Sequence, residues 1–171
     1  MTQQRVPDVT FHTRARAEDG SFDWKTLTSA DVFGGKRVVL FALPGAFTPA
    51  CSETHLPGFE QHHDAFTALG IDTIACLSVN DAFVMNQWAR SMNIEKVMML
   101  PDGNASFTRQ MGMLVDRSAQ GMGLRSWRYS ALVEDHEVTA LFSEEGRRDN
   151  PPGVPVVMSG ASIMLDHLRA G

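Results

Sequence analysis

Two cysteines are the residues of this 171-residue chain best suited to redox chemistry. Cys51 lies in the segment 44–52 (PGAFTPACS), which follows a short apolar run, 37–43, typical of a buried strand. A Pro-Gly turn ends that run, and Pro49 suits the first turn of a helix. We therefore expect Cys51 near a helix start, where unpaired backbone N–H groups and the helix dipole favour the reactive thiolate.

Thr48 precedes Cys51 by three residues, a spacing that can place both side chains on one side of the helix start. Its hydroxyl can donate a hydrogen bond to the sulfur or to an oxygen that attacks it. The competing interpretation is a buried structural cysteine, which behaves as a small apolar residue. The position of Cys51 at a junction of strand, turn and helix favours the reactive thiol.

Cys76 lies inside a second apolar run, 71–79 (IDTIACLSV), which predicts a buried strand. An inert buried thiol is therefore the favoured interpretation of Cys76. With only two cysteines, the chain is neither a disulfide framework nor a Cys-rich zinc module.

The elements that must position these residues alternate between strand and helix. The predicted strands are 37–43, 71–79, 97–100, 127–134 and 137–142, the last two forming a hairpin around 135–136. The predicted helices run from about residue 49 past Phe66, from an N-cap at Asn80 or Asp81 through Arg90, and over 159–168. Residues 144–155 are expected to form a surface loop, and 121–123 a turn. This order predicts an α/β sandwich with a mixed sheet.

The length and composition indicate a single globular domain spanning residues 1–171. A hydrophobic content of 43% with 20% charged residues excludes long disorder. A net charge of -5 argues against a nucleic-acid or anionic-membrane partner. Because we find neither a secretory signal nor an apolar run of transmembrane length, we expect a cytoplasmic protein.

The segment 44–52, followed by THLPGF at 54–59, closely resembles the peroxidatic-cysteine segment of the peroxiredoxins. Specifically, it is similar to the peroxiredoxin-5 branch, which includes the plant type II and the bacterial glutaredoxin-dependent enzymes. Further matches are ACLSVNDAFV at 75–84, WAR at 88–90 and RSWRYSALVED at 125–135. The resemblance covers about residues 6–168. It implies a thioredoxin fold with peroxiredoxin-type insertions, its mixed central sheet flanked by helices.

The resemblance implies a thiol peroxidase that needs no cofactor and no metal. Cys51 would attack the peroxide and become a sulfenic acid, while Thr48 would hydrogen-bond the peroxide and Pro44 would shield the pocket. Arg128 would stabilise the negative charge that develops, a task suited to a permanently charged guanidinium. His55 matches a polar position that supports the site. The family motif favours Arg128 over Arg125, which strand periodicity places on the opposite face.

The resemblance leaves two routes for reducing the sulfenic acid. The region 154–160, where some relatives carry a resolving cysteine, has none here. Cys76 matches a cysteine proposed to resolve the plant enzymes, but its predicted burial favours an external thiol. We therefore expect glutathione with glutaredoxin, in preference to thioredoxin, as the reductant of Cys51. The branch also implies a homodimer, with Phe47 and residues 81–84 as candidate contacts.

Other functions fit the residues less well. A redox sensor would oxidise Cys51 without turnover, and only steady-state kinetics separates it from a peroxidase. A thioredoxin-type oxidoreductase needs Cys-x-x-Cys, but the chain has Thr48-x-x-Cys51. A Cys–His hydrolase would need His55 as a separate base, a geometry that one short helix rarely provides. His55, His62 and His63 lack the further ligands of a metal site.

Overall fold

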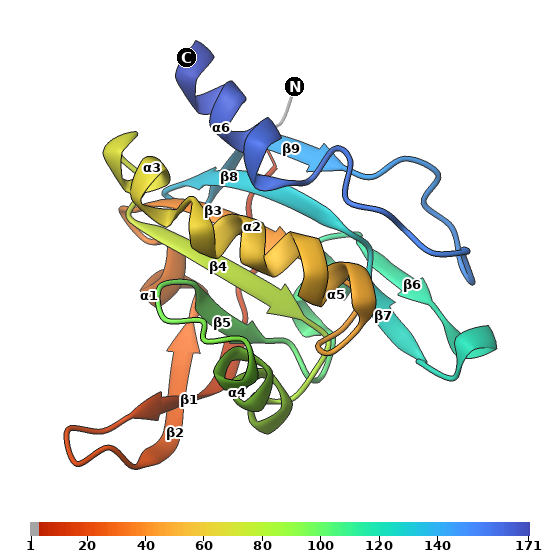
Figure 1. Ribbon diagram of the computed structural model, residues 1–171, viewed down its shortest axis with the longest axis horizontal. Coiled ribbons are helices and arrows are strands. Elements are labelled where there is room, and N and C mark those ends of the chain that lie inside the picture. The colour runs from red at the N-terminus through yellow and green to blue at the C-terminus, as the bar shows by residue number, and fades with distance from the viewer. Residues whose placement is uncertain (1–3) are drawn as a thin grey trace.

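A mixed five-stranded sheet forms the centre of the computed structural model, which describes residues 4–171 (Figure 1). The strand order is β5-β4-β3-β8-β9, with bounds Met98–Pro101, Thr73–Ser78, Arg37–Ala42, Tyr129–Glu134 and Glu137–Ser143. β3 pairs in parallel with β4, and β4 with β5, whereas β8 runs antiparallel to both β3 and β9. The α/β thioredoxin fold with a mixed sheet, predicted from the sequence, is confirmed.

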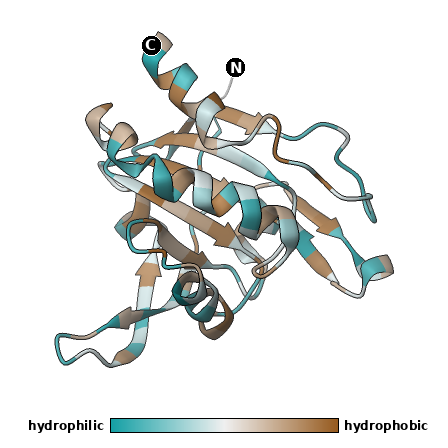
Figure 2. Ribbon diagram, in the orientation of Figure 1, coloured by the Kyte–Doolittle hydropathy of each residue, from teal (hydrophilic) through white to brown (hydrophobic). Residues whose placement is uncertain are grey.

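The central strand β3 is apolar on both faces because each face is covered. Val38 and Leu40 join one buried cluster, while Val39 and Phe41 join a second cluster on the opposite side. This continuous apolar composition fits a strand buried on both sides, and each such side chain contributes about 1.5–3 kcal/mol of hydrophobic stabilisation. Figure 2 shows the resulting hydrophobic colour along the central strands.

The helices supply the residues that complete these two clusters. α2 (Leu56–Gln61), α3 (His63–Ala68), α4 (Ala82–Ser91) and α6 (Ala161–Ala170) contribute to the cluster around Phe41. α1 (Ser29–Phe33) and α5 (Ser106–Gln110) contribute to the cluster around Leu40. Figure 1 shows α2 crossing the front of the sheet, and this helix continues directly from the segment that carries Cys51.

The helix predicted from about residue 49 is interrupted twice. Its Cys51–His55 portion (η1) is a π-turn, in which the amide of Leu56 donates to the carbonyl of Cys51, five residues back. α2 ends at Gln61; the ring Nδ1 of the next residue, His62, is hydrogen-bonded to the carbonyl of Gly58, and α3 begins at His63. The apolar spacing predicted helical structure, but it carries no signal for the wider turn, which is common at functional sites.

Two hairpins outside the central sheet were not predicted. β1 (Thr10–Arg16) pairs with β2 (Phe22–Thr28), and β6 (Leu114–Asp116) pairs with β7 (Leu124–Ser126). β2 is largely exposed and β6 and β7 are three residues each, so neither hairpin leaves a strong hydrophobic pattern. The second hairpin also contains a short 3-10 turn, η2 (Ser118–Gln120), and the predicted turn at 121–123.

Other boundaries agree within two residues. Asp81 caps α4 by accepting a hydrogen bond from the amide of Val84 at 2.9 Å. β8 begins at Tyr129 rather than at residue 127, and α6 starts two residues later than predicted. Within residues 4–171, no helix is long and apolar enough to cross a membrane.

Candidate active site

The loop that follows β3 is fixed by the end of β4. The amide of Ala46 donates to Oδ1 of Asn80 at 3.0 Å, and the hydroxyl of Ser78 donates to the same oxygen at 2.6 Å. Phe47, within this loop, has a φ of 63°, a left-handed conformation uncommon for an aromatic residue. Asn80, which the sequence suggested only as a helix cap, therefore holds the chain just before Cys51.

Cys51 lies at the start of the helical segment, as its position in the sequence predicted, and it is fully buried. Nη2 of Arg128 donates to its Sγ across 3.3 Å. Arg128 belongs to the two-residue connection between β7 and β8, and β8 lies next to β3 in the sheet. A guanidinium donating to sulfur favours the thiolate, which is the nucleophilic form of cysteine.

The guanidinium of Arg128 is held by two further contacts. Its Nε donates to the carbonyl of Val154 at 3.1 Å, and its Nη1 donates to Nδ1 of His55 at 3.0 Å. All three guanidinium nitrogens are thus engaged by the protein. This fixes the plane of the side chain, as a directional donor to Cys51 requires.

His55 supports Arg128 as a neutral acceptor. Because arginine only donates, the proton of the ring lies on Nε2, which donates to the carbonyl of Ser159 at 3.0 Å. Burial lowers the pKa of His55 to about 3, the charge of Arg128 lowers it as well, and the Ser159 carbonyl opposes both. Both ring nitrogens are therefore occupied, and His55 has no free nitrogen with which to act as a base.

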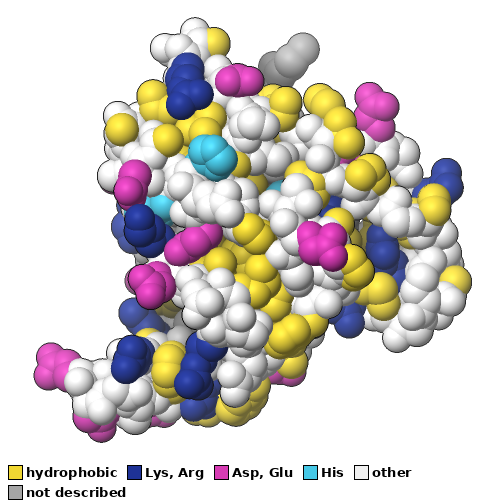
Figure 3. All heavy atoms as spheres, in the orientation of Figure 1, with side chains coloured by type: hydrophobic (Ala, Val, Ile, Leu, Met, Phe, Trp, Pro, Cys, Tyr) yellow, Lys and Arg dark blue, Asp and Glu magenta, His cyan; other side chains and the backbone are white. Residues whose placement is uncertain are grey.

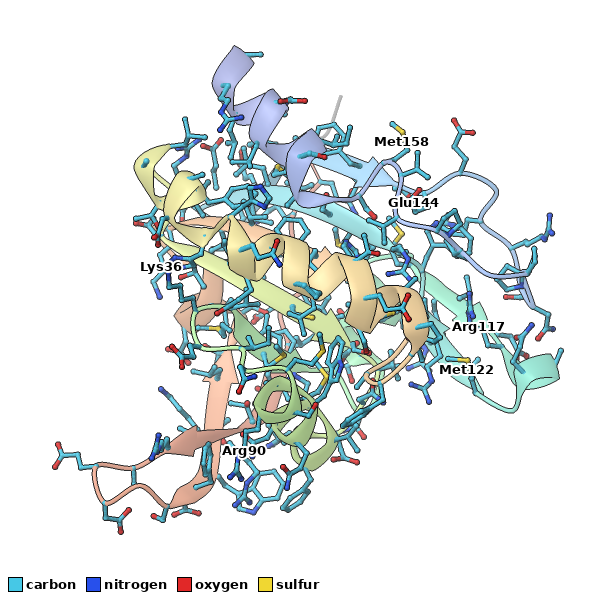
Figure 4. The ribbon with its side chains drawn as sticks, viewed as in Figure 1. Lys36, Arg90, Arg117, Met122, Glu144 and Met158 are labelled. Atoms are coloured by element: carbon cyan, nitrogen blue, oxygen red, sulfur yellow. The ribbon has the colours of Figure 1, made fainter. Side chains whose placement is uncertain are left out.

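Glu144 extends this chain of contacts to the segment before α6. Its Oε1 accepts hydrogen bonds from the amides of Val157, Met158 and Ser159 and from the hydroxyl of Ser159, at 2.7–3.0 Å. Burial alone would raise the pKa of Glu144, but the hydrogen bonds from Ser159, Val157 and Met158 hold it below its ordinary value. Figure 4 labels Glu144 and Met158, which lie close together beside α6.

Most of the residues from 145 to 155 are exposed, as expected of a surface loop, but Glu144 at its start is buried. The sequence presents this region as a charged surface loop, but Glu144 is only 6% exposed. The sequence carries no hydrophobic periodicity that would predict the burial of Glu144, because this side chain binds mainly backbone amides, which leave no pattern of residue types.

Arg128, whose Nη2 donates to the fully buried Cys51 sulfur, lines a cavity of about 270 Å³. Pro44, Thr48 and Arg128 line it, together with Arg117 and Met122. The hydroxyl of Thr48 donates to the carbonyl of Gly45 at 2.7 Å rather than to the sulfur. In Figure 3, Lys and Arg atoms lie among apolar atoms in the part of the surface that carries β6 and β7.

Arg125 lies nearer to the site than strand periodicity predicted. Its Nη1 donates to the carbonyl of Pro44 at 3.4 Å, and its Nε donates to the carbonyl of Met122 at 2.9 Å. The prediction of opposite faces for Arg125 and Arg128 was wrong because β7 ends at Ser126. The alternation of a strand therefore does not continue to residue 128.

Cys76 lies in β4 opposite Phe41 and belongs to the same buried cluster as Cys51. Both cysteines are free thiols. Burial raises the pKa of Cys76 well above its ordinary value, the charge of Cys51 raises it further, and Arg128 acts in the opposite direction. These surroundings favour the neutral, unreactive thiol at Cys76.

A family model described as Redoxin matches residues 1–155. A peroxiredoxin of Synechocystis sp. is 52% identical over 173 residues, covering 99% of this chain and 92% of that protein. The chain belongs to the peroxiredoxin family. Peroxiredoxin-2E of Arabidopsis thaliana, 43% identical over 83% of this chain and 61% of that protein, places it in the peroxiredoxin-5 or type II branch. It is a thiol-dependent peroxidase.

Solved structures agree with this assignment. The antioxidant protein of Plasmodium falciparum, described as a 1-Cys peroxiredoxin, has a TM-score of 0.93 and 32% identity over 99% of both chains. Reduced Prx3 of Vibrio vulnificus in complex with hydrogen peroxide has a TM-score of 0.83 and 40% identity over 98% of both chains. The resemblance read from residues 44–59 and 125–135 is therefore confirmed.

The depressed pKa of His55 predicts an acid-sensitive fold. The unfolded chain binds a proton at His55 below pH 6.5, whereas the native peroxiredoxin does not until about pH 3. Stability is therefore lost as the pH falls through this window. Between pH 7 and pH 5 we expect the free energy of unfolding of the wild type to fall by about 2 kcal/mol more than that of His55→Asn.

Urea unfolding at both pH values measures this difference. The control is His12→Asn, which removes an exposed histidine and should keep the pH dependence of the wild type. Equal pH dependence in the wild type and His55→Asn would contradict the neutral, buried state of His55.

Glu144 predicts a second effect, on the rate of reaction. Glu144→Gln weakens the hydrogen bonds that fix Ser159. Ser159 in turn binds His55, and His55 binds Arg128, so both side chains are held less firmly. We expect the rate constant of Cys51 with hydrogen peroxide to fall by about fivefold, the effect of roughly 1 kcal/mol. Stopped-flow tryptophan fluorescence measures it. Glu145→Gln, a change of the exposed neighbour, should leave the rate as it is; an equal loss in both variants would count against a specific role of Glu144.

Proposed function

We propose that this peroxiredoxin reduces hydrogen peroxide and small organic hydroperoxides at Cys51 and is regenerated by an external thiol. Glutathione with glutaredoxin is favoured over thioredoxin, and a cytoplasmic location with reduced thiols fits this cycle. The observation that carries the proposal is the 3.3 Å contact of the Arg128 guanidinium with the Cys51 sulfur beside the cavity.

The first step transfers one oxygen to sulfur. The Cys51 thiolate attacks the nearer peroxide oxygen, the O–O bond breaks, and the departing oxygen takes a proton and leaves as water or an alcohol. Arg128 stabilises the negative charge spread over sulfur and oxygen. The hydroxyl of Thr48 donates its hydrogen bond to the carbonyl of Gly45. Its oxygen is therefore free to accept a hydrogen bond from the peroxide O–H. Pro44 shields the cavity from water.

The second step returns sulfur to the thiol. An external thiol attacks the Cys51 sulfenic acid, which gives a mixed disulfide and water, and a second thiol then releases Cys51 as the first leaves in a disulfide. The fully buried Cys76, with its raised pKa, is a poor attacking group for this step. The likeness to a structure described as a 1-Cys peroxiredoxin supports the same cycle. The preference for glutaredoxin over thioredoxin as the reductant is based on the resemblance to the peroxiredoxin-5 branch, which includes glutaredoxin-dependent enzymes.

Peroxide consumption by three proteins tests this cycle. With glutathione and glutaredoxin, we expect Cys51→Ser to lose activity by at least about a hundredfold, because the nucleophile is absent. Cys76→Ser should keep activity within about twofold of the wild type, as expected of a conservative change. Thioredoxin in place of glutaredoxin should give slower turnover. Activity that survives in Cys51→Ser would overturn the proposed role of this residue.

Intact mass after one equivalent of peroxide, without thiols, tests the role of Cys76 directly. The external-thiol cycle predicts the gain of one oxygen atom. A loss of two hydrogens with no added oxygen would instead indicate a disulfide between Cys51 and Cys76.

We also propose a homodimer through the face near the active-site loops. Phe47 is 57% exposed and Phe83 is 53% exposed, both large apolar side chains close to the loop that Asn80 fixes. Trp24 packs edge-on against Phe83 with ring centroids 5.0 Å apart and is itself exposed. Exposed aromatic groups of this kind are typical of protein interfaces.

Phe83→Asp tests this interface, because an aspartate in the first turn of α4 is compatible with the helix. We expect the dimer dissociation constant to rise by at least about tenfold on burial of an unpaired charge. Sedimentation velocity over a concentration series measures it. Leu141→Asp, at an exposed position of the edge strand β9, is the control and should leave the dimer intact. A monomeric wild type would refute the proposal.

A further inference from the structure

Arg117 is the charged residue of the cavity that the peroxidase mechanism does not use. It follows β6, and a turn holds its backbone, with its amide donating to the carbonyl of Gly123 at 2.7 Å. The residue is only 7% exposed, and its Nε and Nη2 have no hydrogen-bond partner within residues 4–171. An unpaired buried group of this kind is costly, so it requires an explanation.

Arg128 and Arg125 differ from Arg117 in this respect. Three nitrogens of Arg128 and two of Arg125 donate to atoms of the protein, as described above. None of the ion pairs formed within residues 4–171 includes any of these three arginines. Among the described residues, the lining of the cavity therefore contains two guanidinium groups, Arg117 and Arg128, and no carboxylate to balance them.

We propose that Arg117 is the anion-binding part of a subsite for the carboxylate of a small reactant whose other end reacts at Cys51. A carboxylate fits because its two oxygens match the donor geometry of a guanidinium, and Arg117 is a guanidinium of the cavity whose Nε and Nη2 no described protein group engages. Arg117 and Met122, both labelled in Figure 4, line the same cavity as Pro44, Thr48 and Arg128. One molecule can thus contact Arg117 and reach toward the buried sulfur.

Two kinds of reactant can bring such a carboxylate. One is the reducing thiol, of which glutathione carries two carboxylates, and this source rests on the proposed external-thiol cycle. The other is a hydroperoxide that bears a carboxylate, which rests only on the peroxidase activity. Arg117 then determines specificity in the reducing or in the oxidising step, without itself taking part in the bond changes.

Single-turnover kinetics with matched charged and neutral reactants distinguishes these sources. For reduction, preformed Cys51 sulfenic acid is mixed with glutathione or with glutathione diethyl ester. For oxidation, the reduced protein is mixed with linoleic acid hydroperoxide or with its methyl ester. The quantity compared is the ratio of the charged to the neutral rate constant, in which any general effect on the reactivity of Cys51 cancels.

Arg117→Gln should lower one of these two ratios by about tenfold, as expected for the loss of one charge-assisted hydrogen bond. Arg117→Lys keeps the positive charge but lacks the paired donors of a guanidinium. Its ratio should therefore lie between those of Arg117→Gln and the wild type. Arg169→Gln, which removes an exposed charge from α6, should keep both ratios of the wild type.

The outcomes separate cleanly. A fall in the glutathione ratio assigns the subsite to the reductant, and a fall in the hydroperoxide ratio assigns it to the oxidant. Unchanged ratios in Arg117→Gln, or charged and neutral reactants slowed equally, would overturn the proposal. If no thiol reduces the wild-type sulfenic acid, the external-thiol cycle fails instead, and the hydroperoxide arm still tests Arg117.

Discussion

The contact between the Arg128 guanidinium and the buried Cys51 sulfur is the interaction around which the site is organised. A thiolate without exposed surface is costly unless a charge and a hydrogen bond compensate for its desolvation, and one arginine supplies both. The rest of the site keeps that arginine in place. Val154 and His55 occupy its other nitrogens, Ser159 holds His55, and Glu144 holds Ser159.

The need to hold Arg128 in place explains why His55 is neutral and Glu144 is ionised. His55 must stay neutral to accept from Arg128, and its burial ensures this at any pH above its depressed pKa. Glu144 must stay ionised to accept from three amides and a hydroxyl, and those same donors stabilise its charge. The two groups are perturbed in ways that strengthen the same hydrogen-bonded arrangement. Cys76, in the same cluster but without a donor of its own, is left as a neutral core residue.

The residues that could be predicted from the sequence are those with a local pattern. Buried strands such as β3 leave a continuous apolar run, and the placement of Cys51 follows from the strand, the turn and Pro49. Glu144 and Asn80 bind backbone amides distant in sequence, so no spacing indicates their role. Arg117 lies beyond a three-residue strand with no detectable period. Arg125 was misplaced because strand alternation was extended past the end of β7.

The chain order of the site has a consequence for the protein during its synthesis. Cys51 emerges early, but Arg128, Glu144 and Ser159 come from later parts of the chain and meet it only when β8 and the segment before α6 dock. Until then the nascent chain has the thiol of Cys51 without the guanidinium of Arg128 and without the residues that hold this guanidinium in place. The complete set of contacts around the Cys51 sulfur therefore forms only after the chain through Ser159 has been made.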